Sequence, residues 1–148
     1  MTETKATNAT YLGYIQNAIT RMGQNSFHAK TWCITLLAAL LVFFLGQTDA
    51  ATRCCSLAIS CAVTVLFCLL DTYYLYLERG YRHLYKLAAN LLPDNSEVIQ
   101  EYEMSIPQSQ RGFRKYVDSL ISVTTGLFYL IVLVLQIALI ICAVKGVC

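Results

Sequence analysis

The sequence predicts an all-α membrane protein with three transmembrane helices, on the evidence of its composition and its apolar runs. Of its 148 residues, 57% are apolar and 14% are charged, whereas ordinary globular domains contain about 25% charged residues. This balance excludes a disordered chain and an ordinary soluble enzyme domain. Two prolines and seven glycines leave little sequence for turns, and the formal net charge of +2 is too small to indicate nucleic-acid binding.

Three apolar runs are the candidate membrane spans, over residues 31–46, 54–70 and 120–144. A transmembrane helix needs about 20 largely apolar residues. The third run is long enough by itself, and flanking aromatic and basic side chains can complete the first two. Because about 30 polar and amphipathic residues precede the first run, we interpret it as a retained span and not as a cleaved signal peptide.

The lysines and arginines predict the orientation. Nine of them lie in residues 1–30 and 71–119, and only Arg53 and Lys145 lie in the short connector and the C-terminal end. Cytoplasmic segments carry the excess of these residues. We therefore expect three crossings, with the N-terminus in the cytoplasm and the C-terminus on the opposite side.

The helices of the first two spans are expected to be longer than the bilayer is thick. No proline occurs from residue 11 to residue 92, and apolar residues recur at helical spacing before the first span. A helix over residues 11–46 would be about 54 Å long, against about 30 Å of hydrocarbon core. We predict one helical domain, 1–148, in which a long antiparallel hairpin and helical segments over about 11–30 and 71–119 extend into the cytoplasm.

With the turn of this hairpin near Ala50, each residue has an expected partner at equal height. Lys30 then lies beside Asp71 at the inner membrane edge, and Arg21 beside Glu78 or Arg79. Since an unpaired charge near the membrane interior is unfavourable, we expect inter-helix ion pairs; the alternative is that the charges meet lipid head groups and water. Glu78 can also pair with Arg82 on the same helix.

A stripe of small side chains in the second span predicts close helix packing. In lipid, helices associate through close contact of small residues, and the spacing does not distinguish a neighbour in the same chain from another copy. The stripe consists of Cys54, Ala58, Cys61, Val65 and Cys68. The seven cysteines include no CxxC pair, and we interpret them as packing residues.

The connection before the third span combines acidic and basic segments. Asp94 and Glu97 resemble a helix N-cap with a capping box, and acidic Glu101 and Glu103 follow. Pro107 divides the connection. The basic residues Arg111, Arg114 and Lys115 are expected to anchor lipid head groups.

No catalytic constellation is evident in the sequence. The two histidines, His28 and His83, are out of level in the predicted hairpin, so a shared metal site is not expected. We find no glycine-rich phosphate loop and no nucleophile elbow. We therefore expect neither an enzyme nor a metal or other cofactor.

A ring of copies of this chain could enclose an aqueous channel. The polar residues that could line it are Asn17, Arg21, Asn25 and His28 in the first helix, or Ser56, Ser60 and Thr64 in the second. The alternative role for these side chains is hydrogen bonding between helices.

Two polar stretches beside the spans resemble a known family. They read YIQNAITRM over 14–22 with NSF over 25–27, and LD at 70–71 with YYL, ER and YR downstream. Over about residues 11–90 the chain resembles the RipA family of small octameric bacterial membrane proteins. The resemblance implies a homo-oligomeric ring and kinship with the pore-like membrane accessory proteins of type VI-B CRISPR systems. The matching polar residues are Asn17, Thr20, Arg21, Asn25, Asp71, Glu78 and Arg82.

These observations lead to one main functional hypothesis and two alternatives. The main hypothesis is an octameric pore effector of the bacterial inner membrane, which acts in antiphage defence by depolarising or permeabilising that membrane. Its partners would be the lipid bilayer, its own copies and a soluble defence partner or nucleotide trigger, without direct DNA binding. The first alternative is a nucleotide- or oligonucleotide-gated channel similar to the SLATT proteins, with a basic site of Arg79, Arg82, Lys86 and residues 111–115. The second is a non-conducting scaffold that docks a soluble partner through residues 91–119.

Overall fold

The computed structural model describes residues 2–91 and 102–144, and this part of the chain contains helices and no strand. The elements are α1 (Thr2–Gly46), α2 (Ala50–Ala88), the short 3₁₀ helix η1 (Gln108–Gln110), α3 (Phe113–Leu120) and α4 (Val123–Val144). The helices α1, α2 and α4 are long and apolar enough to cross a membrane. The predicted all-α membrane protein with a long first hairpin is confirmed.

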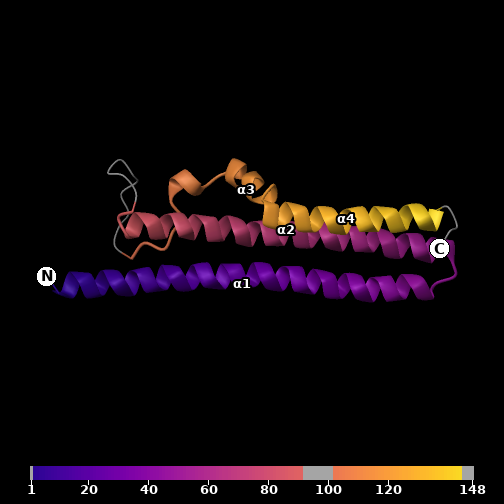
Figure 1. The fold of residues 1–148 in the computed structure, drawn as a ribbon, viewed down its shortest axis with the longest axis horizontal. Helices are drawn as coiled ribbons and strands as arrows, with labels where there is room; N and C mark the ends of the chain where they lie inside the picture. Colours follow the sequence, from indigo (N-terminus) through magenta and orange to yellow (C-terminus); the bar gives the residue numbers. More distant parts are fainter. Residues whose placement is uncertain (1, 92–101, 145–148) are drawn as a thin grey trace.

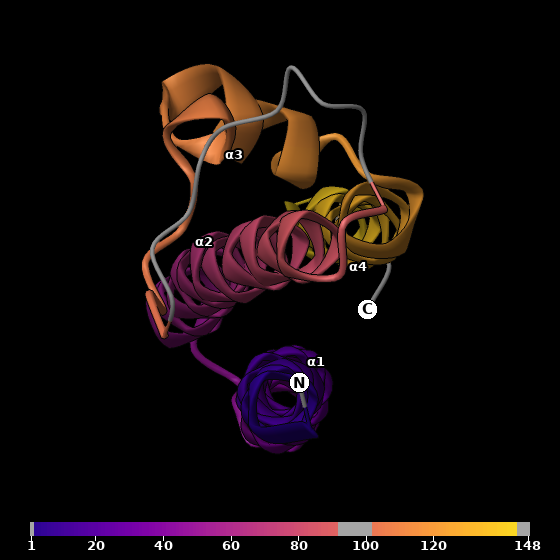
Figure 2. The ribbon, with the colours of Figure 1, turned by 90° about the vertical axis from the view of Figure 1, so that its left-hand side faces the viewer.

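The central element is α2. It runs antiparallel to α1, and α4 lies along the half of α2 that is nearer the α1–α2 turn (Figure 1). The end-on view places α1 and α4 on different sides of α2 (Figure 2). The helix α3 lies on the side of α2 that faces away from α1 (Figure 2). Every membrane-length helix therefore packs on α2.

The hairpin is longer than the sequence predicts at its N-terminal end. The helix α1 begins at Thr2 and not near residue 11, since neither proline nor glycine interrupts residues 2–12. At 1.5 Å per residue, α1 is about 67 Å long and α2 about 58 Å. Beyond the membrane-length portion, Tyr11, Ile15 and Ile19 of α1 form an apolar cluster with Leu84 of α2.

A three-residue turn and an aspartate cap join the two long helices. Asp49 is the N-cap of α2, and its Oδ2 accepts hydrogen bonds from the Thr52 N–H at 2.9 Å and the Thr52 hydroxyl at 2.8 Å. These bonds lower the pKa of the exposed Asp49 carboxyl below its usual value, and the bond from the Thr52 N–H makes the larger contribution. At the same end, the Arg53 guanidinium lies 4.6 Å from the centre of the Phe44 ring.

The predicted helical extension over about 71–119 is interrupted, because α2 ends at Ala88. Among the described residues that follow, helix returns at η1 and at α3. Asn90 adopts φ 53°, and the Leu91 N–H donates to the Lys86 carbonyl at 2.9 Å. The bond spans five residues and follows the left-handed Asn90, whose own N–H donates to the Leu87 carbonyl at 3.0 Å. The two bonds together are the helix-ending Schellman arrangement. Three residues of the predicted acidic segment lie outside the described residues: the capping-box pair Asp94 and Glu97, and Glu101.

The segment 102–112 lies across the hairpin before α3 begins. Ile106 packs so closely on buried Gly80 that a Cβ on this glycine would lie 2.7 Å from Ile106 Cγ2. Gly112, with φ 128°, introduces α3. The third span starts at Val123, and not at the predicted residue 120, because α3 ends at Leu120 and a turn at Ile121 and Ser122 separates the two helices.

The cap gives a pH-dependent prediction. We expect Asp49→Ala to lower the melting temperature in detergent at pH 7, because the first turn of α2 loses its acceptor. Since the folded pKa of Asp49 is lowered, its contribution is complete above the unfolded pKa of about 3.9 and is lost as the pH falls through the lower folded value.

The matched control is Asp49→Asn, which keeps an N-cap acceptor but does not titrate. Its melting temperature should differ little from wild type at pH 7, and the wild-type advantage over Asp49→Ala should shrink at pH 3. An Asp49→Ala defect that stays the same at both pH values would contradict the assignment.

Candidate functional site: a buried ion pair and a polar core between membrane helices

A buried carboxylate joins the three membrane-length helices at one level. Asp71 of α2 has no exposed surface. Its Oδ2 lies 2.6 Å from Lys30 Nζ of α1 and accepts a 3.3 Å hydrogen bond from Thr125 of α4, and its Oδ1 accepts a 2.5 Å bond from Ser26. The structure thus brings together Lys30 and Asp71, the pair expected from the hairpin register.

The two members of this ion pair differ in their access to solvent. The Lys30 side chain keeps 21% of its surface exposed, and Lys30 Nζ also donates to Ser26 Oγ at 3.0 Å. Its long stem can carry the ammonium towards water or head groups. The Asp71 carboxylate lacks such a route, so its stability in the folded chain depends on the three donors around it.

The buried face of α2 continues this polar character through the membrane. Ser56, Ser60 and Thr64 are buried, and each hydroxyl donates to a carbonyl of its own helix at 2.8–3.0 Å. Large apolar side chains such as Ile59 and Leu66 lie exposed on the remaining surface of α2. The polar residues face protein and the apolar residues face lipid, as expected where the solvent is hydrocarbon.

Three polar residues of α4 hold it against this face of α2. Thr125 bonds Asp71, the Tyr129 hydroxyl donates to the Phe67 carbonyl at 3.1 Å, and Gln136 Nε2 donates to Thr64 Oγ1 at 2.8 Å. The sequence analysis did not assign these α4 residues. Their spacing of four and seven in an otherwise apolar run was the available signal, because it puts them on one helix face.

The two serines and the threonine of α2 that were candidates for a pore lining are therefore part of the packing between helices. Ser56, Ser60 and Thr64 are buried within one subunit. They bond to their own backbone, and Thr64 accepts from Gln136. Their alternative role, hydrogen bonding between helices, is seen for the Thr64 side chain, whereas the Ser56 and Ser60 hydroxyls bond within α2.

The polar residues predicted on α1 lie mostly on its uncovered side. Asn17, Thr20, Arg21 and His28 are exposed, and Asn25 is half-buried. The His28 ring lies between Phe27 and Trp32, with centroid distances of 6.1 and 6.3 Å.

The second expected inter-helix pair is not formed. Glu78 binds Arg82, four residues along α2, with Oε1 2.7 Å from the guanidinium Nη2. The Glu78 carboxylate lies next to Gly23 of α1. The register expectation of Arg21 beside Glu78 is wrong because Glu78 lies level with Gly23, and Arg82 on the same helix reaches it first.

The small-residue stripe is only partly covered within the subunit. Cys54, Ala58 and Val65 are exposed, and Cys61 and Cys68 are half-buried. The serine and threonine face contacts α4 instead, because it pairs with the polar residues of α4. The stripe remains available to another copy.

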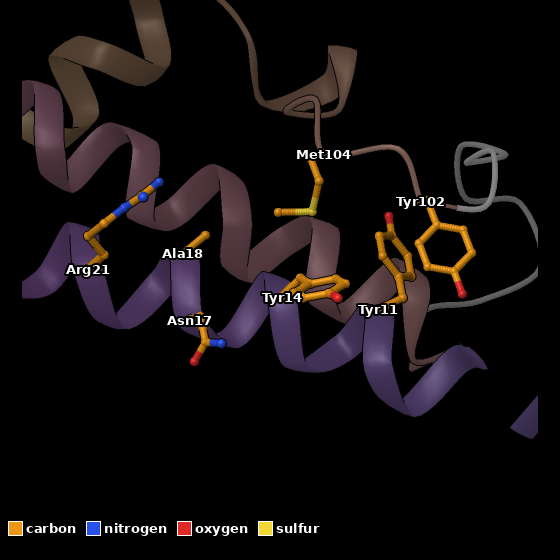
Figure 3. A pocket seen from close by; sticks show the side chains of 7 residues that line it. All are labelled: Tyr11, Tyr14, Asn17, Ala18, Arg21, Tyr102 and Met104. Atoms are coloured by element: carbon orange, nitrogen blue, oxygen red, sulfur yellow. The ribbon is translucent and has the colours of Figure 1, made fainter. Parts of the chain in front are cut away.

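A groove of about 390 Å³ lies where the segment 102–106 meets α1. The Tyr11 hydroxyl donates to the Glu103 carbonyl at 2.6 Å, and the Tyr11 and Tyr102 rings lie 5.6 Å apart. Figure 3 shows Tyr11 beside Tyr102, with Asn17 pointing away from the other lining side chains. The lining residues are Tyr11, Tyr14, Asn17, Ala18, Arg21, Tyr102 and Met104.

Of the basic residues of the alternative nucleotide site, Arg79 and Lys115 line one small pocket of about 120 Å³, but three of the arginines already have contacts within the subunit. Arg79 donates to the Asp118 carbonyl at 3.1 Å and to Ser122 Oγ at 2.8 Å, and so ties α2 to α3. Arg82 pairs with Glu78. The Arg111 Nε donates to the Ile106 carbonyl at 2.6 Å.

Within residues 2–91 and 102–144, no group of three or more His, Cys, Asp and Glu side chains is placed to hold a metal ion. His83 lies 3.4 Å from the Ser109 hydroxyl, far along the hairpin from His28.

Comparison of the chain with protein-family models, curated proteins and solved structures finds no match.

The ion pair predicts an asymmetric response to mutation. Lys30→Met should destabilise the protein by about 3–5 kcal/mol, because it leaves the fully buried Asp71 without its counter-charge. Asp71→Leu should cost less, since Lys30 can extend towards water. The double variant Lys30→Met/Asp71→Leu should recover most of the loss, and equilibrium unfolding in mixed detergent micelles measures all three.

The control for this series is Arg82→Met, which breaks the more exposed Glu78–Arg82 pair and should cost only about 0.3 kcal/mol. Equal losses for Lys30→Met and Arg82→Met, or additive losses in the double variant, would contradict the central role of the buried pair.

Proposed function

We propose that this protein is the subunit of a homo-oligomeric membrane channel whose lumen is lined by the exposed face of α1. One observation carries the proposal. Six exposed polar residues recur on α1 at spacings of four and three, and we call them the α1 stripe: Asn17, Arg21, Gln24, His28, Thr31 and Thr35. This spacing keeps them on one face of a helix.

The position of the α1 stripe is unusual for a lipid-facing surface. Thr31 and Thr35 follow Lys30 into the apolar run, and their hydroxyls donate to the Phe27 and Thr31 carbonyls at 3.0 and 2.9 Å. The α2-facing side of α1 is occupied by buried Met22, Ala29 and Cys33. In a lone subunit the inner end of the stripe would face lipid, whereas in a ring it would face a shared axis.

Beyond Thr35 the same face becomes apolar. The next exposed positions at this spacing are Ala38 and Val42, and Val42 is 71% exposed. Polar walls that lead to an apolar constriction are a known way to close a channel by dewetting. The channel would therefore be closed near Val42 until the subunits rearrange.

The remaining features fit a ring in the bacterial inner membrane. The exposed Cys54, Ala58 and Val65 allow close approach of a neighbouring copy. The lysine and arginine distribution favours a cytoplasmic N-terminus, which puts Asn17 and Arg21 at the cytoplasmic entrance. The resemblance to the RipA family extends the proposal to eight subunits and to antiphage defence by membrane depolarisation.

The nucleotide-gated alternative receives less support, because Arg79, Arg82 and Arg111 already bind groups within the subunit. The scaffold alternative depends on residues 91–119, which are only partly among the described residues.

The decisive experiment is imaging of the purified particle along its symmetry axis together with current recording in planar bilayers. We expect a closed ring with α1 nearest the axis and discrete conductance steps. A monomer that passes no current would overturn the proposal, and so would a ring with α4 at its centre.

A charge reversal tests the lining directly. Arg21→Glu should shift the reversal potential in a salt gradient towards cation selectivity, because a ring of arginines becomes a ring of glutamates. Arg114→Glu is the matched control, since Arg114 is also exposed but lies on α3. Equal shifts for both variants, or none for Arg21→Glu, would contradict the assignment of the α1 stripe.

A further inference from the structure

An apolar crevice lies at membrane depth between α1 and α4, with α2 as its floor. Its volume is about 510 Å³, within the 300–1,000 Å³ of typical small-molecule sites. Its walls are leucines, isoleucine, valine and alanine, with Phe44 towards the α1–α2 turn. Because it extends from the level of Ile34 to that of Phe44, it occupies the half of the membrane nearer that turn.

The polar groups of the crevice are few. Ser56 and Ser60 line its floor, and their hydroxyls already donate to the Arg53 and Leu57 carbonyls. Gln136 of α4 lines it as well and is only 6% exposed. Its Nε2 donates to Thr64 Oγ1 and to the Ser60 carbonyl.

The Oε1 of Gln136 differs from these groups. It is buried, and within the described residues it has no hydrogen-bond partner. A buried acceptor without a donor is unfavourable, and the amide cannot turn over without losing both bonds of its Nε2. The crevice therefore combines apolar walls with one acceptor that lacks a donor.

We propose that the crevice binds an elongated apolar molecule carrying a hydrogen-bond donor, of the chemical class of long-chain alcohols. The chain would lie between the leucines of α1 and α4, and its hydroxyl would donate to Gln136 Oε1 after a small movement of the amide. The site lies within one subunit and needs no second copy, and it shares Ala38 of α1 with the apolar continuation of the α1 stripe. An acyl chain without a donor would pack against the apolar walls but could not donate to Gln136 Oε1. A small polar solute could donate to Oε1 but would not pack against the apolar walls.

The thiol of Cys142 provides a local readout, because this residue lines the crevice and is half-buried. The wild-type protein in lipid nanodiscs is labelled with a membrane-permeant maleimide, and labelling of each cysteine is followed by peptide mass spectrometry. The exposed Cys55, which is not part of the small-residue stripe, is the internal control. The probes are 1-hexadecanol and hexadecane, which differ by the hydroxyl.

We expect hexadecanol to slow labelling of Cys142 about fivefold more than hexadecane at equal mole fraction, the effect of one hydrogen bond of about 1 kcal/mol. Labelling of Cys55 should be unaffected. Gln136→Leu should abolish the difference between the probes. Thr64→Val removes a partner of Nε2 but leaves Oε1 in place, so it should retain the difference and controls for disturbed packing.

Three results would overturn the proposal. Equal protection by both probes would mean that the acceptor plays no part, and protection by neither would mean that the crevice does not bind chains. A Cys142 that is unreactive without any probe, and that crosslinks to another copy, would show that a neighbouring subunit fills the crevice. A supporting result would stand even if no conductance were found.

Discussion

Burial of the Asp71 carboxylate is the interaction on which the architecture depends. It is surrounded by donors from α1 and α4, so the three membrane-length helices meet at this residue. An ionised group can remain in such a place only when its charge and lone pairs are satisfied. The geometry therefore fixes the register of α1 on α2 and the depth of α4 together.

The same logic extends along α2. In water, a helix buries its apolar side, but α2 buries serines, threonines and an aspartate and exposes isoleucine and leucines. Lipid solvates these apolar side chains as well as a protein core would, so little is gained by burying them. Hydrogen bonds and close approach decide which face is inside, and this is why α4 contacts α2 through Tyr129 and Gln136.

With α2 covered on two sides, α1 and α4 leave two different surfaces. The α1 stripe is polar and continues past the level of Lys30. The crevice is apolar except for Gln136 Oε1. The first surface can face an aqueous axis in a ring, and the second is matched to a chain from the bilayer. Both surfaces involve α1, which also forms one wall of the crevice. Arg21 and Gln136 lie on different helices, so a lumen and a lipid site can still be altered by separate mutations.

The sequence by itself determined the helical class, the three spans, the long hairpin and the Lys30–Asp71 pair. Apolar run length, the absence of proline and helical periodicity are local properties that need no knowledge of neighbours. The tertiary structure decided which face of α2 is buried, that Glu78 pairs with Arg82 and not with Arg21, and that α2 ends at Ala88. Each of these depends on competition between partners whose distances arise only on folding. A single membrane span can carry polar residues on several of its faces. Only the position of α4 decides which face of α2 is covered.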